Sequence, residues 1–224
     1  MAPATRLKAA YVALAAADTA LSMSSRPAAH KARYLTKPLL MPTLSASLAM
    51  APGASSARLP VLAAQAAGWV GDVGLLSEER RPFVVGTTGF ALGHAAYLAA
   101  FVPRRRRTPG LTSDPRARAL AGVWAASAPM MAWRARREGV GPVVAAYSAS
   151  LTAMVVAATR LDASERPAGR RLVAAGALTF LASDSILGLR KFVLPDPDPR
   201  LEGAVMATYT AAQLLLSEGA ARLA

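Results

Sequence analysis

The 224-residue sequence contains no cysteine and only two histidines. Without cysteine the chain has no disulfide framework, no thiolate metal site and no cysteine nucleophile. Two histidines argue against a histidine-based zinc site, so we expect neither a metal nor another cofactor. Charged residues are also scarce, at 17% of the chain, where soluble domains carry roughly a quarter. This scarcity argues against a soluble protein.

Apolar residues make up 54% of the chain, which excludes a disordered protein. The formal net charge is +13, a value that would suggest nucleic-acid binding on a soluble protein. Here the basic residues form short clusters between long apolar runs. That arrangement is typical of loops that face anionic lipid headgroups, so we expect membrane lipids and no nucleic acid as partners.

The apolar runs are long enough for membrane helices, because a hydrocarbon core of about 30 Å needs roughly 20 apolar residues. Three long runs lack Asp, Glu, Lys and Arg, three are broken by one aspartate each (Asp18, Asp72 or Asp184), and two are shorter. Continuous runs exclude alternating strands. We predict an all-α polytopic membrane protein, a bundle of about eight transmembrane helices forming a single integral membrane domain over residues 1–224. The expected spans lie near 7–25, 35–51, 59–77, 83–102, 117–133, 140–159, 171–189 and 201–219.

The largest basic cluster is the run of four arginines at 104–107, after the fourth expected span. We interpret it as a solvated loop that fixes topology, since cytoplasmic loops carry an excess of Lys and Arg. With eight spans both termini then lie in the cytoplasm. The first run follows Arg6 and Lys8 but lacks a small-residue cleavage site, so a retained span is favoured over a signal peptide. We expect an integral protein of the bacterial plasma (inner) membrane.

Ionisable residues inside the expected spans are the first functional candidates, because each costs about 2.5–3.5 kcal/mol on insertion scales. In the third span Gln65, Gly68 and Asp72 share one helical face. Gly68 and Gly71 allow a neighbouring helix or a substrate to approach the backbone closely. Asp72 is therefore either a functional carboxyl or a hydrogen-bonded packing residue, and the cost of burial favours function.

Two other spans carry polar side chains at helical spacing. Phe90, His94 and Tyr97 share a face of the fourth span, and Tyr209 lies one turn before Gln213 in the eighth. These side chains either line a pocket or form hydrogen bonds between helices.

The seventh span has a stripe formed by Gly176, Phe180 and Asp184. Ser183 lies beside it, but no base stands in the order that a serine nucleophile requires. We expect its hydroxyl to bond the backbone carbonyl one turn back.

Lys37, with Pro38, marks the expected start of the second span. It either extends towards lipid headgroups or binds a phosphate, and Asp18 is a candidate partner for it.

Taken in order, these segments resemble the YhhN / TMEM86 family of membrane proteins, which includes lysoplasmalogenases. The resemblance covers nearly the whole chain. It implies hydrolysis of the vinyl ether bond of a lysoplasmalogen, with a fatty aldehyde and a glycerophospho-amine as products. It also implies that Asp72 and Asp184 are the best catalytic candidates. The segments that carry it are 36–39, Gly71-Asp72, the stretch from Gly86 to Tyr97, 176–184, and Tyr209 with Gln213.

Two carboxyls suit this chemistry, because acid cleaves a vinyl ether through an oxocarbenium ion like that of glycoside hydrolysis. A carboxyl held among apolar helices can keep a proton at neutral pH, and a second carboxyl can handle the water. We therefore expect Asp72 and Asp184 to face one shared, partly apolar cavity that binds a lysophospholipid. The expected substrate-binding residues are Lys37, His94, Tyr97, Tyr209 and Gln213.

Two other functions fit the same residues. A small ion- or proton-coupled carrier would use the two aspartates to bind ions or relay protons. A non-catalytic membrane protein would bind lipids through its basic loops. Release of aldehyde from a lysoplasmalogen distinguishes the enzyme from both.

Overall fold

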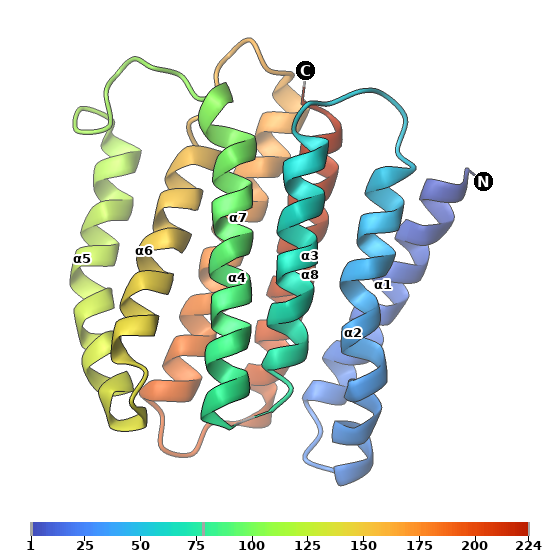
Figure 1. Cartoon of the computed structure of the whole chain (residues 1–224), viewed down its shortest axis with the longest axis vertical. Coiled ribbons are helices and arrows are strands. Elements are labelled where there is room, and N and C mark those ends of the chain that lie inside the picture. Colours follow the sequence, from blue (N-terminus) through green and yellow to red (C-terminus); the bar gives the residue numbers. More distant parts are fainter. Residues whose placement is uncertain (1, 78, 224) are drawn as a thin grey trace.

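The computed structural model describes residues 2–77 and 79–223, and in that part of the chain it is a bundle of eight α-helices without a β-sheet (Figure 1). The all-helical class predicted from the sequence is therefore confirmed. A short 3₁₀ turn follows α4 and another follows α5. The helices are α1 (Pro3–Ser22), α2 (Pro27–Ala49), α3 (Arg58–Gly74), α4 (Arg80–Phe101), α5 (Pro115–Ala135), α6 (Gly141–Ala158), α7 (Pro167–Phe192) and α8 (Pro199–Ala221).

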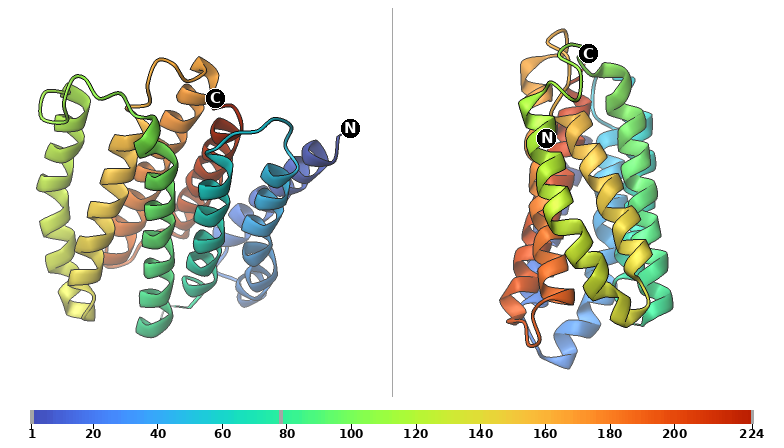
Figure 2. Two further views of the ribbon diagram at one scale, coloured as in Figure 1. Left: turned by 45° about the horizontal axis from the view of Figure 1, so that its top comes forward. Right: turned by 90° about the vertical axis from the view of Figure 1, so that its left-hand side faces the viewer.

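The helices form two layers that run nearly along one axis (Figures 1 and 2). One layer contains α2, α3, α4 and α6, and the other contains α1, α8 and α7. Helix α5 lies at one edge, where it packs mainly on α6. The start of α1 and the end of α8 lie at the same end of the bundle, because successive helices run in alternating directions. Helix α8 packs against α7, α1, α3 and α2, which places its polar residues at the centre.

Helices α3 and α4 approach each other through glycines. A Cβ atom built on Gly74 would lie 2.6 Å from the Cα atom of Gly86, and one on Gly71 would lie 2.5 Å from the ring of Phe90. A larger residue at either glycine would separate the helices. The close approach expected at Gly71 is thus present, and it seats the Phe90 ring beside the turn that carries Asp72.

The outer surface of the bundle is apolar. Within residues 2–77 and 79–223, three segments are long and apolar enough to cross a membrane: Arg80–Arg104, Gly141–Ala158 and Pro167–Phe192. Large apolar side chains such as Leu35 and Leu92 are more than half exposed. An exposed apolar surface of this kind marks contact with lipid. The chain is a helical membrane protein, and membrane crossing by the five more polar helices stays a prediction.

Helix α2 begins at Pro27, which corrects the expected start near residue 35. The start was placed too late because the charged residues before 35 were expected to form a loop. Arg33 is instead buried, and its guanidinium contacts Asp18 at 3.4 Å and Glu202 at 3.1 Å. Pro38 consequently lies inside the helix and not at its start. Its carbonyl accepts a hydrogen bond from Nε1 of Trp69 on α3, at 2.9 Å.

The arginine run at 104–107 is not simply a solvated loop. Arg104 is 3.5 Å from a carboxylate oxygen of Glu165, and Arg106 is 2.6 Å from one of Asp114. Asp114 is fully buried and also pairs with the buried Arg160. The Arg104–Glu165 and Asp114–Arg160 ion pairs therefore tie the α4–α5 connection to the α6–α7 connection, at the end of the bundle where α1 begins and α8 ends, whereas Arg106 pairs within the α4–α5 connection.

Candidate functional site

Asp72 lies in the interior of the bundle, on the buried face of α3 that it shares with Gln65 and Gly68. Its Oδ2 atom accepts a hydrogen bond of 2.8 Å from the hydroxyl of Tyr209 on α8. The face predicted from helical spacing is therefore buried as expected. The Oδ1 atom of Asp72 is also buried, and it has no hydrogen-bond partner among the described residues.

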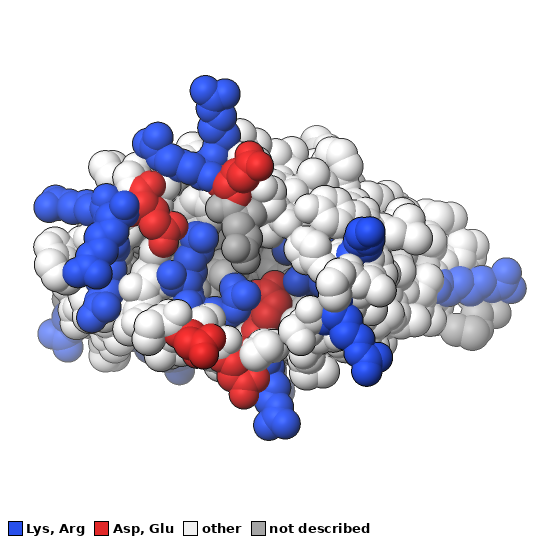
Figure 3. Space-filling model, turned by 90° about the horizontal axis from the view of Figure 1, so that it is seen from below, with Lys and Arg blue, Asp and Glu red and all other residues white. Residues whose placement is uncertain are grey.

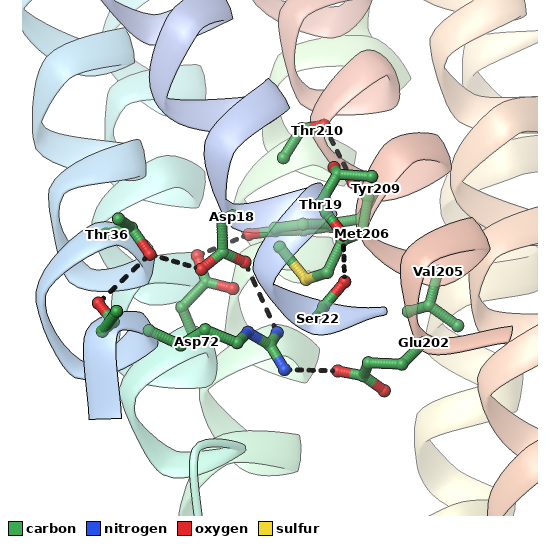
Figure 4. A network of polar contacts seen from close by, with 12 residues as sticks. Asp18, Thr19, Ser22, Thr36, Asp72, Glu202, Val205, Met206, Tyr209 and Thr210 are labelled. Atoms are coloured by element: carbon green, nitrogen blue, oxygen red, sulfur yellow. Dashed lines mark hydrogen bonds and ion pairs between the residues drawn. The ribbon is translucent and has the colours of Figure 1, made fainter. Parts of the chain in front are cut away.

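A charged network surrounds this position (Figure 4). Asp18 of α1 is fully buried and accepts a 2.6 Å hydrogen bond from the hydroxyl of Thr36, besides its contact with Arg33. Arg33 continues the network to Glu202 of α8. The expected pairing of Asp18 with Lys37 is wrong, because Arg33, one turn earlier on α2, takes that place. Lys37 is buried, and it interacts electrostatically with Asp72 and Glu202.

Two of the predicted substrate-binding residues bind each other. The hydroxyl of Tyr97 on α4 donates a 2.6 Å hydrogen bond to Oε1 of Gln213 on α8, and both side chains are buried. Gln213 also lies next to Gly68, where a Cβ atom would meet its Nε2 atom at 3.7 Å. The pair holds α4 and α8 together one helical turn from the Asp72–Tyr209 contact.

Asp184 has a separate partner. The hydroxyl of Tyr147 on α6 donates a short hydrogen bond to its Oδ2 atom. The His94 ring lies 5.0 Å from the Tyr147 ring and 5.4 Å from that of Phe180, measured between centroids. Its Nδ1 atom is 3.0 Å from the hydroxyl oxygen of Ser150, and its buried Nε2 atom has no partner among the described residues. His94 thus belongs to the surroundings of Asp184.

Tyr147 was not among the residues expected from the sequence. It lies in the uncharged run 139–159, and a membrane span is predicted there from the apolar residues, without any role for the polar ones. The segment Tyr147-Ser148-Ala-Ser150 is nevertheless a polar island in that run. Polar side chains inside a membrane helix form contacts between helices, so this island was the signal that could have identified Tyr147.

An apolar cavity of about 190 Å³ lies between α4, α5, α6 and α7, and Asp184 and Tyr147 line it. Val123 and Trp124 of α5 also line it while remaining exposed, so the cavity reaches the outer surface of the bundle. The rest of its wall is mainly apolar, and it includes Phe83, Phe90, Leu120, Met131, Leu151 and Leu187.

Asp72 does not line this cavity. Phe90 lines the cavity, and its ring centroid is 5.6 Å from that of Tyr209. The Tyr209 hydroxyl in turn donates its hydrogen bond to Asp72. The cavity therefore contains one of the two carboxyls, and not both as expected. Helical spacing shows which face of α3 or α7 is buried, but it does not show which neighbour the face meets.

A second cavity, of about 280 Å³, opens at the end of the bundle opposite the termini. Figure 3 looks onto this end, where basic side chains surround a hollow with acidic side chains beside it. Lys37 lines this second cavity. Leu75, Phe83, Leu187 and Lys191 line both cavities, so the two are neighbours. The other charged or titratable residues of the second cavity are His30, Arg33, Arg190 and Glu202.

Ser183 is buried, and its hydroxyl donates a 3.0 Å hydrogen bond to the carbonyl of Val205 on α8. The expected acceptor was a carbonyl of its own helix, so that expectation is wrong. Helix α7 packs closely on α8 because Gly176 lies against Leu216. The carbonyl of Val205 on α8 is therefore within hydrogen-bond distance of the Ser183 hydroxyl. Ser183 therefore connects two helices.

The fold and the interior define a class of protein: a helical membrane bundle that holds carboxyls away from water. The chain belongs to the YhhN family, which it matches over residues 32–220.

The chain is similar to two proteins named lysoplasmalogenase, from Mycobacterium bovis (strain ATCC BAA-935 / AF2122/97) and Mycobacterium tuberculosis (strain CDC 1551 / Oshkosh). Each is 30% identical over 142 residues, which are 61% of this chain and 50% of the relative. The chain thus spans about half the length of the curated relatives it matches. No solved structure matches the chain.

Proposed function

We propose that this protein is a membrane-embedded hydrolase that cleaves the vinyl ether bond of lysoplasmalogens. Membership of the YhhN family and the relatives named lysoplasmalogenase support a hydrolase of this kind. The single observation that carries the proposal is Asp184, a carboxyl that lines an apolar cavity reaching the lipid-facing surface. A hydrocarbon chain can occupy such an apolar cavity, where the carboxyl of Asp184 would contact it.

The proposed reaction consumes one water and needs only proton transfers. A protonated carboxyl donates its proton to the vinyl carbon that is not bonded to oxygen, and the C–O unit becomes an oxocarbenium ion. Water adds to that ion and loses a proton to a carboxylate, which gives a hemiacetal. The hemiacetal collapses to a fatty aldehyde and the free hydroxyl of the glycerophospho-amine. General acid–base catalysis contributes about 10²–10⁴-fold per group.

The structure supports different positions for the two carboxyls. Asp184 is the group that touches the substrate chain, with Tyr147 orienting it. Asp72 is the second carboxyl of the proposal, held by Tyr209. Its electrostatic neighbour Lys37 lines the basic cavity, so Asp72 serves the polar side of the substrate. Asp72 lines neither cavity, and its Oδ1 atom has no hydrogen-bond partner among the described residues, so we propose that it accepts a proton from a water that enters beside it during the reaction.

Aldehyde release from a defined lysoplasmalogen by the purified full-length protein tests the proposal. We expect Asp184→Asn and Asp72→Asn each to lower turnover by about 10²–10⁴-fold, because asparagine keeps the size but exchanges no proton. Asp198→Asn is the matched control, since Asp198 caps α8 at an exposed position where asparagine caps equally well.

Near-normal turnover of both interior variants would refute the acid–base assignment. Transport of the lipid or of protons without aldehyde release would favour the carrier instead. Chelators should leave the activity unchanged, because the described residues offer no cluster of three or more metal-ligating His, Asp or Glu side chains. Activity that is abolished by chelation and restored by metal would contradict the mechanism.

A further inference from the structure

We propose that the two neighbouring cavities form one site for a single-chain phospholipid, in which Lys37 and Lys191 bind the phosphate and the apolar cavity holds the chain. This inference rests on the proposed function, because it specifies how the substrate of that function lies. It adds a phosphate site at the basic end of the bundle and names Lys191 as the residue at the junction.

The first support is the charge balance of the basic cavity. Arg33 and Arg190 each lie 3.1 Å from a different carboxylate oxygen of Glu202, so these two arginines are already paired. Lys37 is 5% exposed and lines the basic cavity, and it makes no close hydrogen bond or ion pair with another described residue. Asp72 and Glu202 act on it only through longer-range electrostatics. A phosphate in this cavity can make the close charge-assisted contact with the ammonium that these carboxyls do not make.

Lys191 is the second cation of this site, and its ion pair with Glu138 is long and partly exposed to solvent. Its nearest carboxylate oxygen, on Glu138, is 3.7 Å away, and its ammonium lies 4.7 Å from the centroid of the Phe83 ring. Both Lys191 and Phe83 line both cavities. The ammonium therefore stands where the basic cavity meets the apolar one. A phosphate bound there has the hydrocarbon site directly beside it.

The spacing along α7 matches such a lipid. Lys191 follows Asp184 by seven residues, which corresponds to about 10 Å along a helix. In a lysophospholipid the ether oxygen and the phosphorus are five bonds apart, roughly 6 Å. A lysine side chain spans the remaining distance. With its phosphate on Lys191, the lipid therefore places its ether bond near Asp184.

The occupant is a lipid from the bilayer and not a free anion, because the apolar cavity opens sideways. Trp124 and Val123 line it and are exposed on the surface of α5. A chain can extend from the cavity past these side chains into the bilayer. A free phosphate would use only the basic cavity and leave the apolar one without a role.

Tryptophan quenching tests this site without any need for catalysis. The ligand is an ether-linked lysophosphocholine with a saturated, brominated chain, which the proposed reaction cannot cleave, presented to the full-length protein in lipid nanodiscs. Trp124 is kept, and Trp69 and Trp133 are replaced by phenylalanine. We expect saturable quenching. A matched protein that keeps only Trp133, exposed on the same helix but outside the cavity, should show only weak, non-saturable quenching.

Removal of each lysine charge tests the proposed phosphate site. Lys37→Gln and Lys191→Gln should each weaken binding about tenfold, on the scale of a charge-assisted hydrogen bond. Lys31→Gln is the matched control, because Lys31 is an exposed lysine of the same helix as Lys37 and lines neither cavity. A brominated alkylglycerol without phosphate should bind all these proteins equally.

Three outcomes would overturn the proposal: unchanged affinity in both cavity lysine variants, identical quenching curves for the Trp124-only and Trp133-only proteins, or binding of inorganic phosphate to the basic cavity that does not compete with the lipid. The last would assign the basic cavity to a free anion. Saturable binding without aldehyde release would contradict the proposed hydrolase while leaving this lipid site standing, so the two failures are distinguishable.

Discussion

Replacing Tyr209 by phenylalanine is the sharpest probe of the interior carboxyl on α3. Tyr209 donates the hydrogen bond that the structure gives Asp72, at 2.8 Å, and Oδ1 of that carboxyl already has no partner among the described residues. Tyr209→Phe therefore leaves both oxygens of a 1% exposed carboxyl unpaired. It removes one oxygen atom and leaves the ring contacts with Phe90 and Phe180 in place.

The expected magnitude follows from the kind of bond that is lost. Hydrogen bonds to charged groups contribute about 1.5–3 kcal/mol. If Asp72 acts as a carboxylate in the rate-limiting step, kcat/KM for aldehyde release should fall by about 10–150-fold in Tyr209→Phe. Loss in kcat, with KM little changed, is the expected pattern, because Tyr209 lines neither cavity.

Tyr11→Phe is the matched control for this experiment. Tyr11 is equally buried, and its hydroxyl donates a 2.9 Å hydrogen bond to the backbone carbonyl of Thr210, the residue after Tyr209. Its loss should cost about 0.5–1.5 kcal/mol of stability and little activity. Activity of Tyr209→Phe within twofold of the unmodified protein, or an equal loss in Tyr11→Phe, would show that the Tyr209 hydrogen bond does not support Asp72 in the reaction.

Three further predictions concern other parts of the molecule. Ser183→Ala should lose about 1 kcal/mol of stability in thermal unfolding, through the lost bond to α8, and should keep its turnover. Reporter fusions after residues 107 and 224 should both report the cytoplasm, and a periplasmic signal from either would contradict the topology. Burial raises the pKa of Asp114, but hydrogen bonds from the α5 backbone and the arginine charges outweigh it and hold that pKa below its usual range. Its stabilising effect should therefore be full above about pH 4, the unfolded value, and disappear as the pH falls through the folded pKa. The melting temperature should drop in that acidic range, and the drop should be smaller in Asp114→Asn.

The sequence alone determined the helical class and the buried faces. Gln65, Gly68 and Asp72 are buried together, as are Phe90, His94 and Tyr97. The reason is that a helix of 3.6 residues per turn fixes which side chains share a face, whatever the helix packs against. The length of the uncharged runs likewise located the helices, because the hydrocarbon thickness is a property of the membrane and not of the protein.

Only the tertiary structure decided which faces meet. Asp72 and Tyr209 are 137 residues apart in the sequence, and Asp184 and Tyr147 are 37 apart. Each contact depends on which helices neighbour one another. The early start of α2 also required the fold, because Arg33 is buried only where Asp18 and Glu202 converge on it from two other helices. Helical periodicity is a local property, whereas the pairing of charges and hydroxyls in this interior depends on contacts between helices that no local pattern contains.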